Sequence, residues 1–202
     1  VPFKLTPTMR SGMILDGAET PRKGAFHIDA LLDLNFGVLG LTQGNSKLGD
    51  LIPFRMDLHI MGSYQLHKRI EVAADLPITV FQLSNFGLLR DRGFYQSDLN
   101  LAGLGDLRVL GRFLVLSQKD FPLGLAGVLE VRFPTGNKYS LMGEWGVVFH
   151  PRIVLERQIA FIRLLGNVGW RLRTDDGQYL NLYLGQEFVA GVGGAIAQKF
   201  AK

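Results

Sequence analysis

The feature that most constrains this chain is a regular alternation of apolar and polar side chains over long stretches. In residues 161–173, FIRLLGNVGWRLR, one parity carries large apolar side chains and the other carries three arginines. Because successive side chains of a β-strand point to opposite faces of its sheet, this pattern predicts a strand with one apolar and one charged face.

The same period of two recurs in about eight runs, most of them about 10 to 14 residues long, whereas globular strands usually have five or six. The runs cover residues 25–36, 52–60, 70–81, 106–116, 123–133, 145–156, 161–173 and, less regularly, 185–200. A tilted strand needs about 9 to 11 residues to cross a bilayer. The connections alternate between short ones, such as 64–69, and long ones, such as 40–50. That alternation is typical of an up-and-down outer-membrane barrel.

Composition narrows the possible classes of protein. Hydrophobic residues make up 47% of the 202 residues and the mean hydropathy is +0.16, which excludes a disordered chain. No window of about 18 residues is apolar enough for a transmembrane helix. The absence of cysteine excludes a disulfide scaffold and a thiolate metal site. The net charge of +4 is modest and spread along the chain, so we expect no nucleic-acid partner.

These patterns predict an all-β fold, namely an up-and-down antiparallel transmembrane β-barrel of about eight strands. The barrel is either complete or part of a larger one. We expect residues 1–23 to form an N-terminal extension and residues 24–200 to form the barrel. Closure of the barrel would remove the unpaired strand edges that hydrocarbon does not tolerate.

Periodicity alone does not say which face is inside, because a soluble barrel shows the same alternation turned inside out. Three observations favour a charged interior, or lumen. The apolar parity is uniformly large, the small residues Ala73, Ala126 and Gly169 lie on the polar parity, and the polar parity carries both signs in near balance. The predicted lumen charge network comprises Asp29, Asp33, Arg55, Asp57, Glu71, Asp75, Arg108, Arg112, Glu130, Arg132, Arg152, Glu156, Arg163, Arg171 and Arg173.

Arginine paired with carboxylates suits a cramped interior. A guanidinium group donates to several acceptors at once, and an unpaired buried charge costs several kcal/mol. A surface in contact with water would carry more lysine than these runs do. We therefore predict that the apolar parity faces lipid.

Two further sets of residues complete the predicted site. His27, His59 and His150 share the polar parity, so we place them in the lumen, where hydrogen bonds to carboxylates are the simplest role and a metal site or proton-sensitive gate is the alternative. We predict neither a cofactor nor a catalytic constellation. Aromatic residues near the ends of the runs suit girdles at the membrane interfaces, namely Phe36, Tyr64, Phe81, Phe133, Trp145 and Trp170.

Several segments resemble the barrel domain of the outer membrane protein A superfamily of Gram-negative bacteria, in the branch whose barrel precedes a peptidoglycan-binding domain. They are RIEVAADLPITVFQ (69–82), GLGDLRVLGRFLVL (103–116), LEVRFPTGNK (129–138), 150–173 and GQEFVAGVGGAIA (185–197). The resemblance implies an outer-membrane barrel that serves as an envelope anchor, a narrow pore or a platform for surface loops. No peptidoglycan-binding domain follows Lys202, and barrels of this branch often have more strands, so we also expect a fragment or a shared barrel.

The expected function is that of an integral outer-membrane protein with a plugged lumen, acting as a structural protein or interaction platform and not as an enzyme. The expected partners are membrane lipid and lipopolysaccharide, with Arg90, Arg92 and Lys138 on external loops as anion contacts, and other envelope proteins or a further barrel segment. One alternative is a small-solute channel, if more strands complete the barrel. A second alternative is a soluble barrel that carries a lipid-like ligand.

Overall fold

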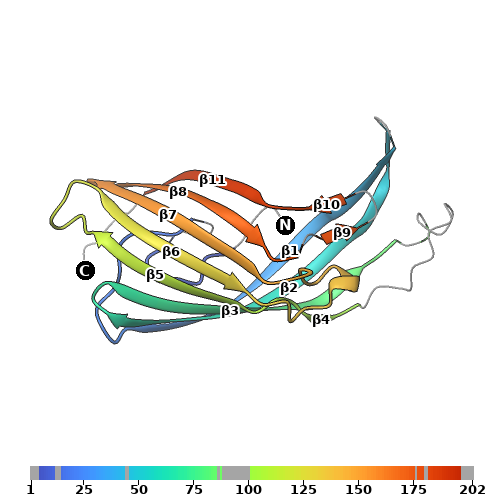
Figure 1. Ribbon diagram of the computed structural model, residues 1–202, viewed down its shortest axis with the longest axis horizontal. Coiled ribbons are helices and arrows are strands. Elements are labelled where there is room, and N and C mark those ends of the chain that lie inside the picture. The colour runs from blue at the N-terminus through green and yellow to red at the C-terminus, as the bar shows by residue number, and fades with distance from the viewer. Residues whose placement is uncertain are drawn as a thin grey trace.

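Eight long strands form one antiparallel sheet in which each strand pairs with the next one along the chain (Figure 1). The computed structural model describes residues 5–11, 15–43, 46–85, 87, 101–175, 177–179 and 182–196. The strands are β1 (Phe26–Gln43), β2 (Ser46–His67), β3 (Ile70–Leu83), β5 (Arg108–Leu116), β6 (Gly124–Arg132), β7 (Val148–Ile159), β8 (Ile162–Arg173) and β11 (Glu187–Ile196). The predicted all-β, up-and-down order of about eight strands is confirmed.

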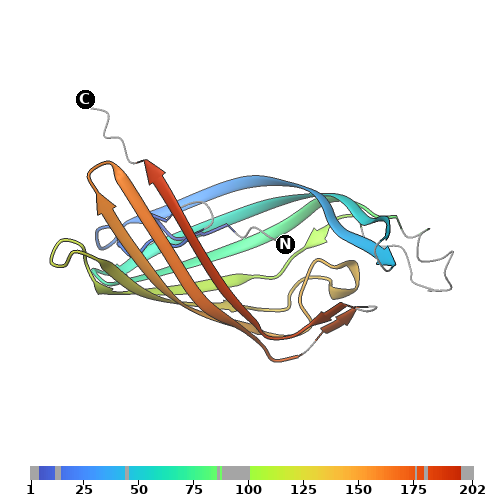
Figure 2. The same cartoon turned by 90° about the horizontal axis from the view of Figure 1, so that it is seen from above.

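The sheet curls into a half-barrel, and its two end strands lie apart (Figure 2). In the part of the chain that the structure describes, β1 pairs only with β2, and β11 pairs only with β8. The described strands therefore do not close on themselves. None of the described residues belongs to a helix that is long and apolar enough to cross a membrane.

The connections differ at the two ends of the sheet. At one end they are residues 68–69, 117–123 and 160–161, and Ala160 takes a positive φ of 52° in the last of these turns. At the other end the connections that follow β3, β6 and β8 are longer and contain the minor elements. These are β4 (Gly103–Leu104), which pairs with β3, the 3-10 helix η1 (Lys138–Ser140), and the hairpin of β9 (Gly177–Tyr179) and β10 (Leu182–Leu184).

The prediction of a long loop at residues 40–50 is wrong. The strands β1 and β2 continue through most of this segment, where Gly40 pairs with Asp50 and Thr42 with Lys47. The physical reason is a local apolar cluster, in which Leu39, Leu41 and Leu141 pack against the buried Leu51. This packing stabilises the hairpin beyond the regular alternation that ends at Phe36.

Burial separates the two faces of the sheet clearly. The charged parity lies on the inner, concave side, where the Arg112 side chain is 1% exposed, and the apolar parity lies on the outer side, where Phe36 is 77% exposed. Small residues do not mark the inner face, because Gly111, Gly127 and Gly166 lie on the outward parity. The near balance of charges was the better guide.

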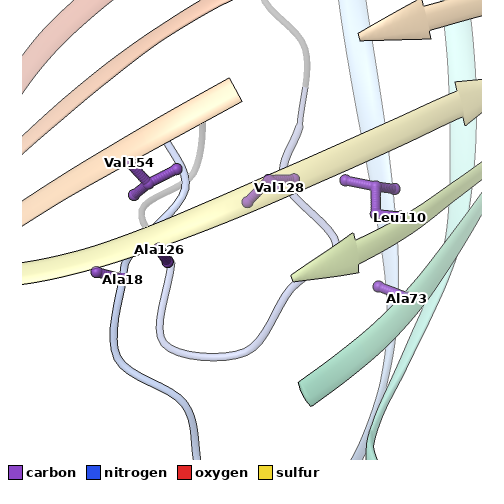
Figure 3. Close-up of a cluster of buried hydrophobic side chains, with 6 residues drawn as sticks. All are labelled: Ala18, Ala73, Leu110, Ala126, Val128 and Val154. Carbon is purple, nitrogen blue, oxygen red and sulfur yellow. The ribbon is translucent and has the colours of Figure 1, made fainter. Parts of the chain in front are cut away.

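The inner face is not entirely polar. A small apolar cluster lies among the charged groups, formed by side chains from β3, β5, β6 and β7 and by Ala18 of the N-terminal segment (Figure 3). Its members are Ala18, Ala73, Leu110, Ala126, Val128 and Val154. Inward Leu110, Val128 and Val154 were not expected, since the apolar parity was predicted to face outward throughout. They pack against one another and against Ala18 of the N-terminal segment.

The close packing between β7 and β8 can be tested by a substitution at Gly169. A Cβ atom at this position would lie 2.5 Å from the carbonyl oxygen of Pro151 and 2.6 Å from Cγ of Arg152. We expect Gly169→Ala to lower the free energy of unfolding by about 1–3 kcal/mol, the usual cost of overpacking, as measured by urea denaturation.

Gly127→Ala is the matched control, because a Cβ at this strand position meets nothing within 4 Å. We expect it to leave stability unchanged or to raise it slightly, since alanine loses less chain entropy on folding than glycine. Equal losses in the two variants would contradict the packing described for Gly169.

Candidate functional site: the charged interior and the N-terminal segment

Glu130 is the centre of the inner network. Its carboxylate is 1% exposed and accepts hydrogen bonds from three arginines, one on its own strand β6 and one on each of the neighbouring strands β5 and β7. The distances are 3.1 Å to Nε of Arg108, 2.9 Å to Nη2 of Arg132 and 2.6 Å to Nη1 of Arg152. Because the guanidinium groups come from β5, β6 and β7, this one carboxylate links three strands on their inner face.

A second chain of pairs connects β3 to β5. The buried Asp75 accepts from Nη1 of Arg108 at 2.7 Å and lies 3.0 Å from Nδ1 of His59 on β2. The buried Glu71 pairs with Arg112 in the same way one step nearer the short connections. These contacts follow the register directly, since Asp75 is opposite Arg108 and Glu71 is opposite Arg112.

A third group lies toward the longer connections. Arg173 donates to Glu144 at 3.1 Å and to Glu187 at 3.0 Å, and Arg132 also reaches Glu144. Arg171 pairs with Glu187. Glu144 lies in the connection between β6 and β7, so the network joins that connection to β8 and β11.

The flank formed by β1 and β2 is held differently. Asp33 and Asp57 lie opposite each other on these two strands. Asp33 accepts from Asn35 at 2.9 Å and Asp57 from Thr79 at 2.7 Å, but within the described ranges neither has an arginine or lysine at ion-pair distance. Arg55 donates instead to the side chain of Gln82 at 2.7 Å and to the carbonyl of Leu141 at 2.9 Å.

All fifteen residues of the predicted network lie on the inward parity of their strands. Eight are buried, namely Arg55, Glu71, Asp75, Arg108, Arg112, Glu130, Arg132 and Glu156. Six are half-buried, namely Asp33, Asp57, Arg152, Arg163, Arg171 and Arg173. Asp29 on the edge strand β1 is exposed and pairs with His27 at 2.5 Å.

Sequence reasoning missed several members of the network. Asp16 pairs with Arg152 at 2.9 Å, and Glu144 and Glu187 pair with Arg173. Glu187 alternates with apolar Phe188 at the start of a regular strand, and that pattern was available in the sequence. Asp16 and Glu144 lie outside the alternating runs, so no periodic signal pointed to them.

The predicted N-terminal extension runs inside the curl of the sheet, where the dark-blue trace in Figure 1 shows it. We call residues 5–11 and 15–20 the inner segment. Asp16 and Ala18 are almost completely buried there. The segment thus forms part of the interior, although its sequence gave no indication of this.

The sheet holds the inner segment mainly through its peptide groups. Arg112 donates to the carbonyls of Met9 and Gly17, both at 2.7 Å. Glu71 accepts from the N–H of Met9 at 2.8 Å, and Glu156 accepts from the N–H of Ala18 at 2.7 Å.

Two side chains of β8 also bind peptide groups of the inner segment. The amide oxygen of Asn167 accepts from the N–H of Asp16 at 2.7 Å, and its amide nitrogen donates to the carbonyl of Asp16 at 3.1 Å. Arg163 donates to the carbonyl of Arg10.

The three predicted lumen histidines are not brought together. His27 is on β1 with Asp29, His59 is on β2 with Asp75, and His150 is on β7 beside Arg152. Since Arg152 can only donate, Nδ1 of His150 accepts at 2.8 Å. Within the described ranges, no three His, Asp or Glu side chains are arranged to hold a metal ion.

Separate cavities remain around these groups. One of about 130 Å³ lies between Asp57, Arg55 and Arg108, and another of about 200 Å³ lies between Asp16, His150 and Arg171. A third, of about 330 Å³, lies between the inner segment and Asp29 of β1. Each has room for water molecules. The arrangement of paired charges therefore supports cohesion of the interior.

The exposed aromatic residues fall into two groups on the outer face. Near the short connections are Phe26, Tyr64, Phe113, Phe121 and Phe161, and toward the longer connections are Phe36, Phe81, Phe133, Phe149, Trp170 and Phe188. Five of the six predicted aromatics belong to these groups. The sixth, Trp145, is half-buried in the connection after β6, where Tyr139 contacts its ring edge-on and Nζ of Lys138 lies 4.7 Å from its centre.

Comparison of the chain with protein-family models, with curated proteins and with solved structures finds no match. The resemblance to the outer membrane protein A superfamily stays a prediction that rests on its sequence segments. Of the predicted loop contacts for lipopolysaccharide, Arg90 and Arg92 lie outside the described residues.

The pair of Glu71 and Arg112 offers a test of the interior. Both side chains are at most 1% exposed, so removing one charge leaves the other buried without its partner. We expect Glu71→Leu and Arg112→Met each to cost about 3–5 kcal/mol of unfolding free energy.

The double variant is the informative control. Because neither charge then remains alone, we expect its loss to be clearly smaller than the sum of the two single losses, as measured by urea denaturation. Strictly additive losses would show that the two side chains do not interact.

Asp106 gives a pH-dependent test outside the long strands. Burial raises the pKa of its carboxyl group, although the N–H groups of Glu144 and Gly136 donate to it at 2.7 and 3.0 Å. A raised pKa in the folded state favours folding at low pH, and this contribution is lost as the pH rises from the ordinary value of 3.8 through the folded pKa. We expect Asp106→Asn to remove this part of the pH dependence, as measured by unfolding between pH 3.5 and 7 in parallel with the unchanged protein, at about 0.5 pH intervals.

Proposed function

We propose that this chain forms the wall of a β-barrel in a bacterial outer membrane and serves the envelope as a structural anchor or interaction platform. The observation that carries the proposal is the outer face of the sheet, which is apolar, exposed and nearly free of charge between its two aromatic groups. A face of this kind is unsuited to water, since soluble monomers rarely expose apolar patches beyond a few hundred Å².

The lack of charge is nearly complete. Apart from the tips of β1 and β2 beyond Phe36 and Phe54, Arg157 is the one charged side chain at the outward positions of the eight described strands. It lies near the turn at Ala160, where a long cationic side chain reaches the polar interface. The neighbouring outward residues Ile153 and Leu155 are 54% and 40% exposed.

The spacing of the aromatic groups also supports a bilayer. Phe26 and Phe36 are ten residues apart on β1, and Phe161, in the turn before β8, precedes Trp170 of β8 by nine residues. Ten residues of strand extend about 33 Å, and a tilt of about 40° reduces this to about 25 Å. That height is typical of the apolar band of outer-membrane barrels, which aromatic girdles border on both sides.

The interior favours a structural role over transport. Most of its charges are paired, apart from Asp33 and Asp57, and the inner segment lies across it. The channel alternative is favoured by one observation, the two unpaired end strands, because additional strands would widen the lumen. Even then, the inner segment would obstruct a pore until it moved.

A carrier of lipid-like ligands is the less supported alternative. Such a carrier would need an apolar cavity, whereas the described interior consists mainly of ion pairs. The proposed partners are membrane lipid and lipopolysaccharide, which the exposed Tyr139 and the neighbouring Lys138 suit as an aromatic and cationic pair near the longer connections. The proposal includes no enzymatic activity.

Two isoleucines on the same face of β7 give a matched test. Ile153 lies at the middle of the strand and Ile159 at its end, and their exposed fractions are similar, at 54% and 51%. If the outer face meets acyl chains, Ile153→Arg should reduce the stability of the protein folded into phospholipid vesicles by about 2–4 kcal/mol. Ile159→Arg should cost about 0–1 kcal/mol, because arginine there reaches the interface.

The measurement is urea-dependent folding into vesicles, followed by the gel mobility of unboiled samples and by co-flotation with lipid. On a surface in contact with water, both substitutions would be tolerated equally. Equal effects in the two variants, or protein that stays monodisperse in plain buffer and does not float with lipid, would overturn the proposal.

A further inference from the structure

The two end strands present unpaired backbone along the whole length of the sheet. β1 bonds only to β2 and β11 only to β8 within the described residues, so one side of each strand offers free N–H and C=O groups. Such edges readily pair with another chain. In hydrocarbon an unpaired edge would cost several kcal/mol for each group, so it does not persist there.

The apolar outer face continues onto both end strands. On β1, Ile28 and Phe36 are 73% and 77% exposed, and on β11, Val192 and Ile196 are 90% and 76% exposed. If the outer face meets lipid, as the proposed function states, then both edges lie in the bilayer and something must pair with them.

The position of the inner segment is incompatible with a closed barrel made of these eight strands alone. The interior of an eight-stranded barrel is just wide enough for side chains. Here the interior also holds a stretch of backbone, which reaches from Glu71 of β3 to the inner side of β11, where Leu15 lies against Gly191 and Gly193. Direct pairing of β11 with β1 would leave no room for this backbone, so the complete barrel must contain more than eight strands.

The inner charges near the two edges are complementary. Asp33 and Asp57 face each other beside the β1 edge, and like charges in this position repel unless a cation joins them. Near the other edge, Arg171 and Arg173 of β8 share Glu187 of β11, and Arg163 of β8 pairs with Glu156 of β7. Inward guanidinium groups therefore outnumber inward carboxylates on β8 and β11 by three to one. An edge with excess carboxylate and an edge with several guanidinium groups fit each other better than either fits a copy of itself.

We propose that a second copy of this chain covers both edges, with β11 of each copy paired with β1 of the other. With eight strands in up-and-down order, β1 and β11 run in opposite directions. Two copies related by a twofold axis along the barrel therefore form two identical antiparallel seams and close a ring of sixteen strands. Closed twofold symmetry is the commonest form of protein assembly.

The absence of cysteine makes this arrangement directly testable. Leu32→Cys places a thiol on the outward parity of β1, and Ala190→Cys, Val192→Cys and Gly194→Cys do so at successive outward positions of β11, which covers neighbouring registers. The single variants are folded together into phospholipid vesicles, one β1 variant with one β11 variant, and are then oxidised.

We expect at least one of the three mixtures to give a disulfide-linked band at twice the 22.4 kDa mass of the chain. Each single variant alone should give none, because in the ring its two thiols lie in opposite seams. Val115→Cys, outward on β5 in the middle of the sheet, is the control and should not link to Leu32→Cys.

Two results would overturn the inference. A link that forms only within one chain, in the double variant of Leu32 and Val192, would show that eight strands close alone. No link in any mixture would show that something other than a second copy covers the edges. Co-flotation of the same samples with lipid separates these outcomes from failure of the proposed function, since protein that does not float contradicts the membrane location itself.

Discussion

Buried pairing of arginine with carboxylate is the interaction on which the rest of this structure depends. The sheet exposes its apolar side chains on the outside, so a hydrophobic core in the usual sense supplies little of its cohesion. The inner face is stable only if its charges are satisfied, because an isolated buried charge would cost far more than a typical contact contributes. Glu130 with its three arginines satisfies this condition most completely.

The same pairs fix how the strands align. A slip of one residue between β3 and β5 would turn Arg108 and Arg112 to the outside and leave Asp75 and Glu71 without partners. The ion pairs therefore specify the register as well as holding neighbouring strands together. The apolar outer face requires the same alternation independently, so both faces of the sheet favour the same register between neighbouring strands.

Much of the fold follows from the sequence, because a period of two is a direct consequence of strand geometry. That the charged residues share one face follows for the same reason, and the near balance of their charges, as with Arg112 and Glu130, predicted that this face is the inner one. Features without a period were beyond this reasoning. The path of the inner segment depends on contacts with strands far along the chain, such as Ala18 with Glu156. The extension of β1 and β2 depends on packing around Leu51, which polar turn residues in the same segment conceal.

The hydrogen bonds between the sheet and the inner segment limit how the amino-acid sequence of this segment can change. Several hydrogen bonds from the sheet go to peptide groups of the inner segment and not to the side chains of the same residues. The bonded groups are those of Met9, Gly17 and Ala18, and their partners are Arg112, Glu71 and Glu156. Peptide groups are common to all residues, so exchanges at an exposed position such as Arg10 leave these anchors unaltered. Insertion or deletion of a single residue would displace every later anchor at once. Substitutions at positions whose side chains make no contact should therefore be tolerated as long as the length is kept, whereas Asp16, Gly17 and Ala18 are also restricted by the pair with Arg152 and by close packing.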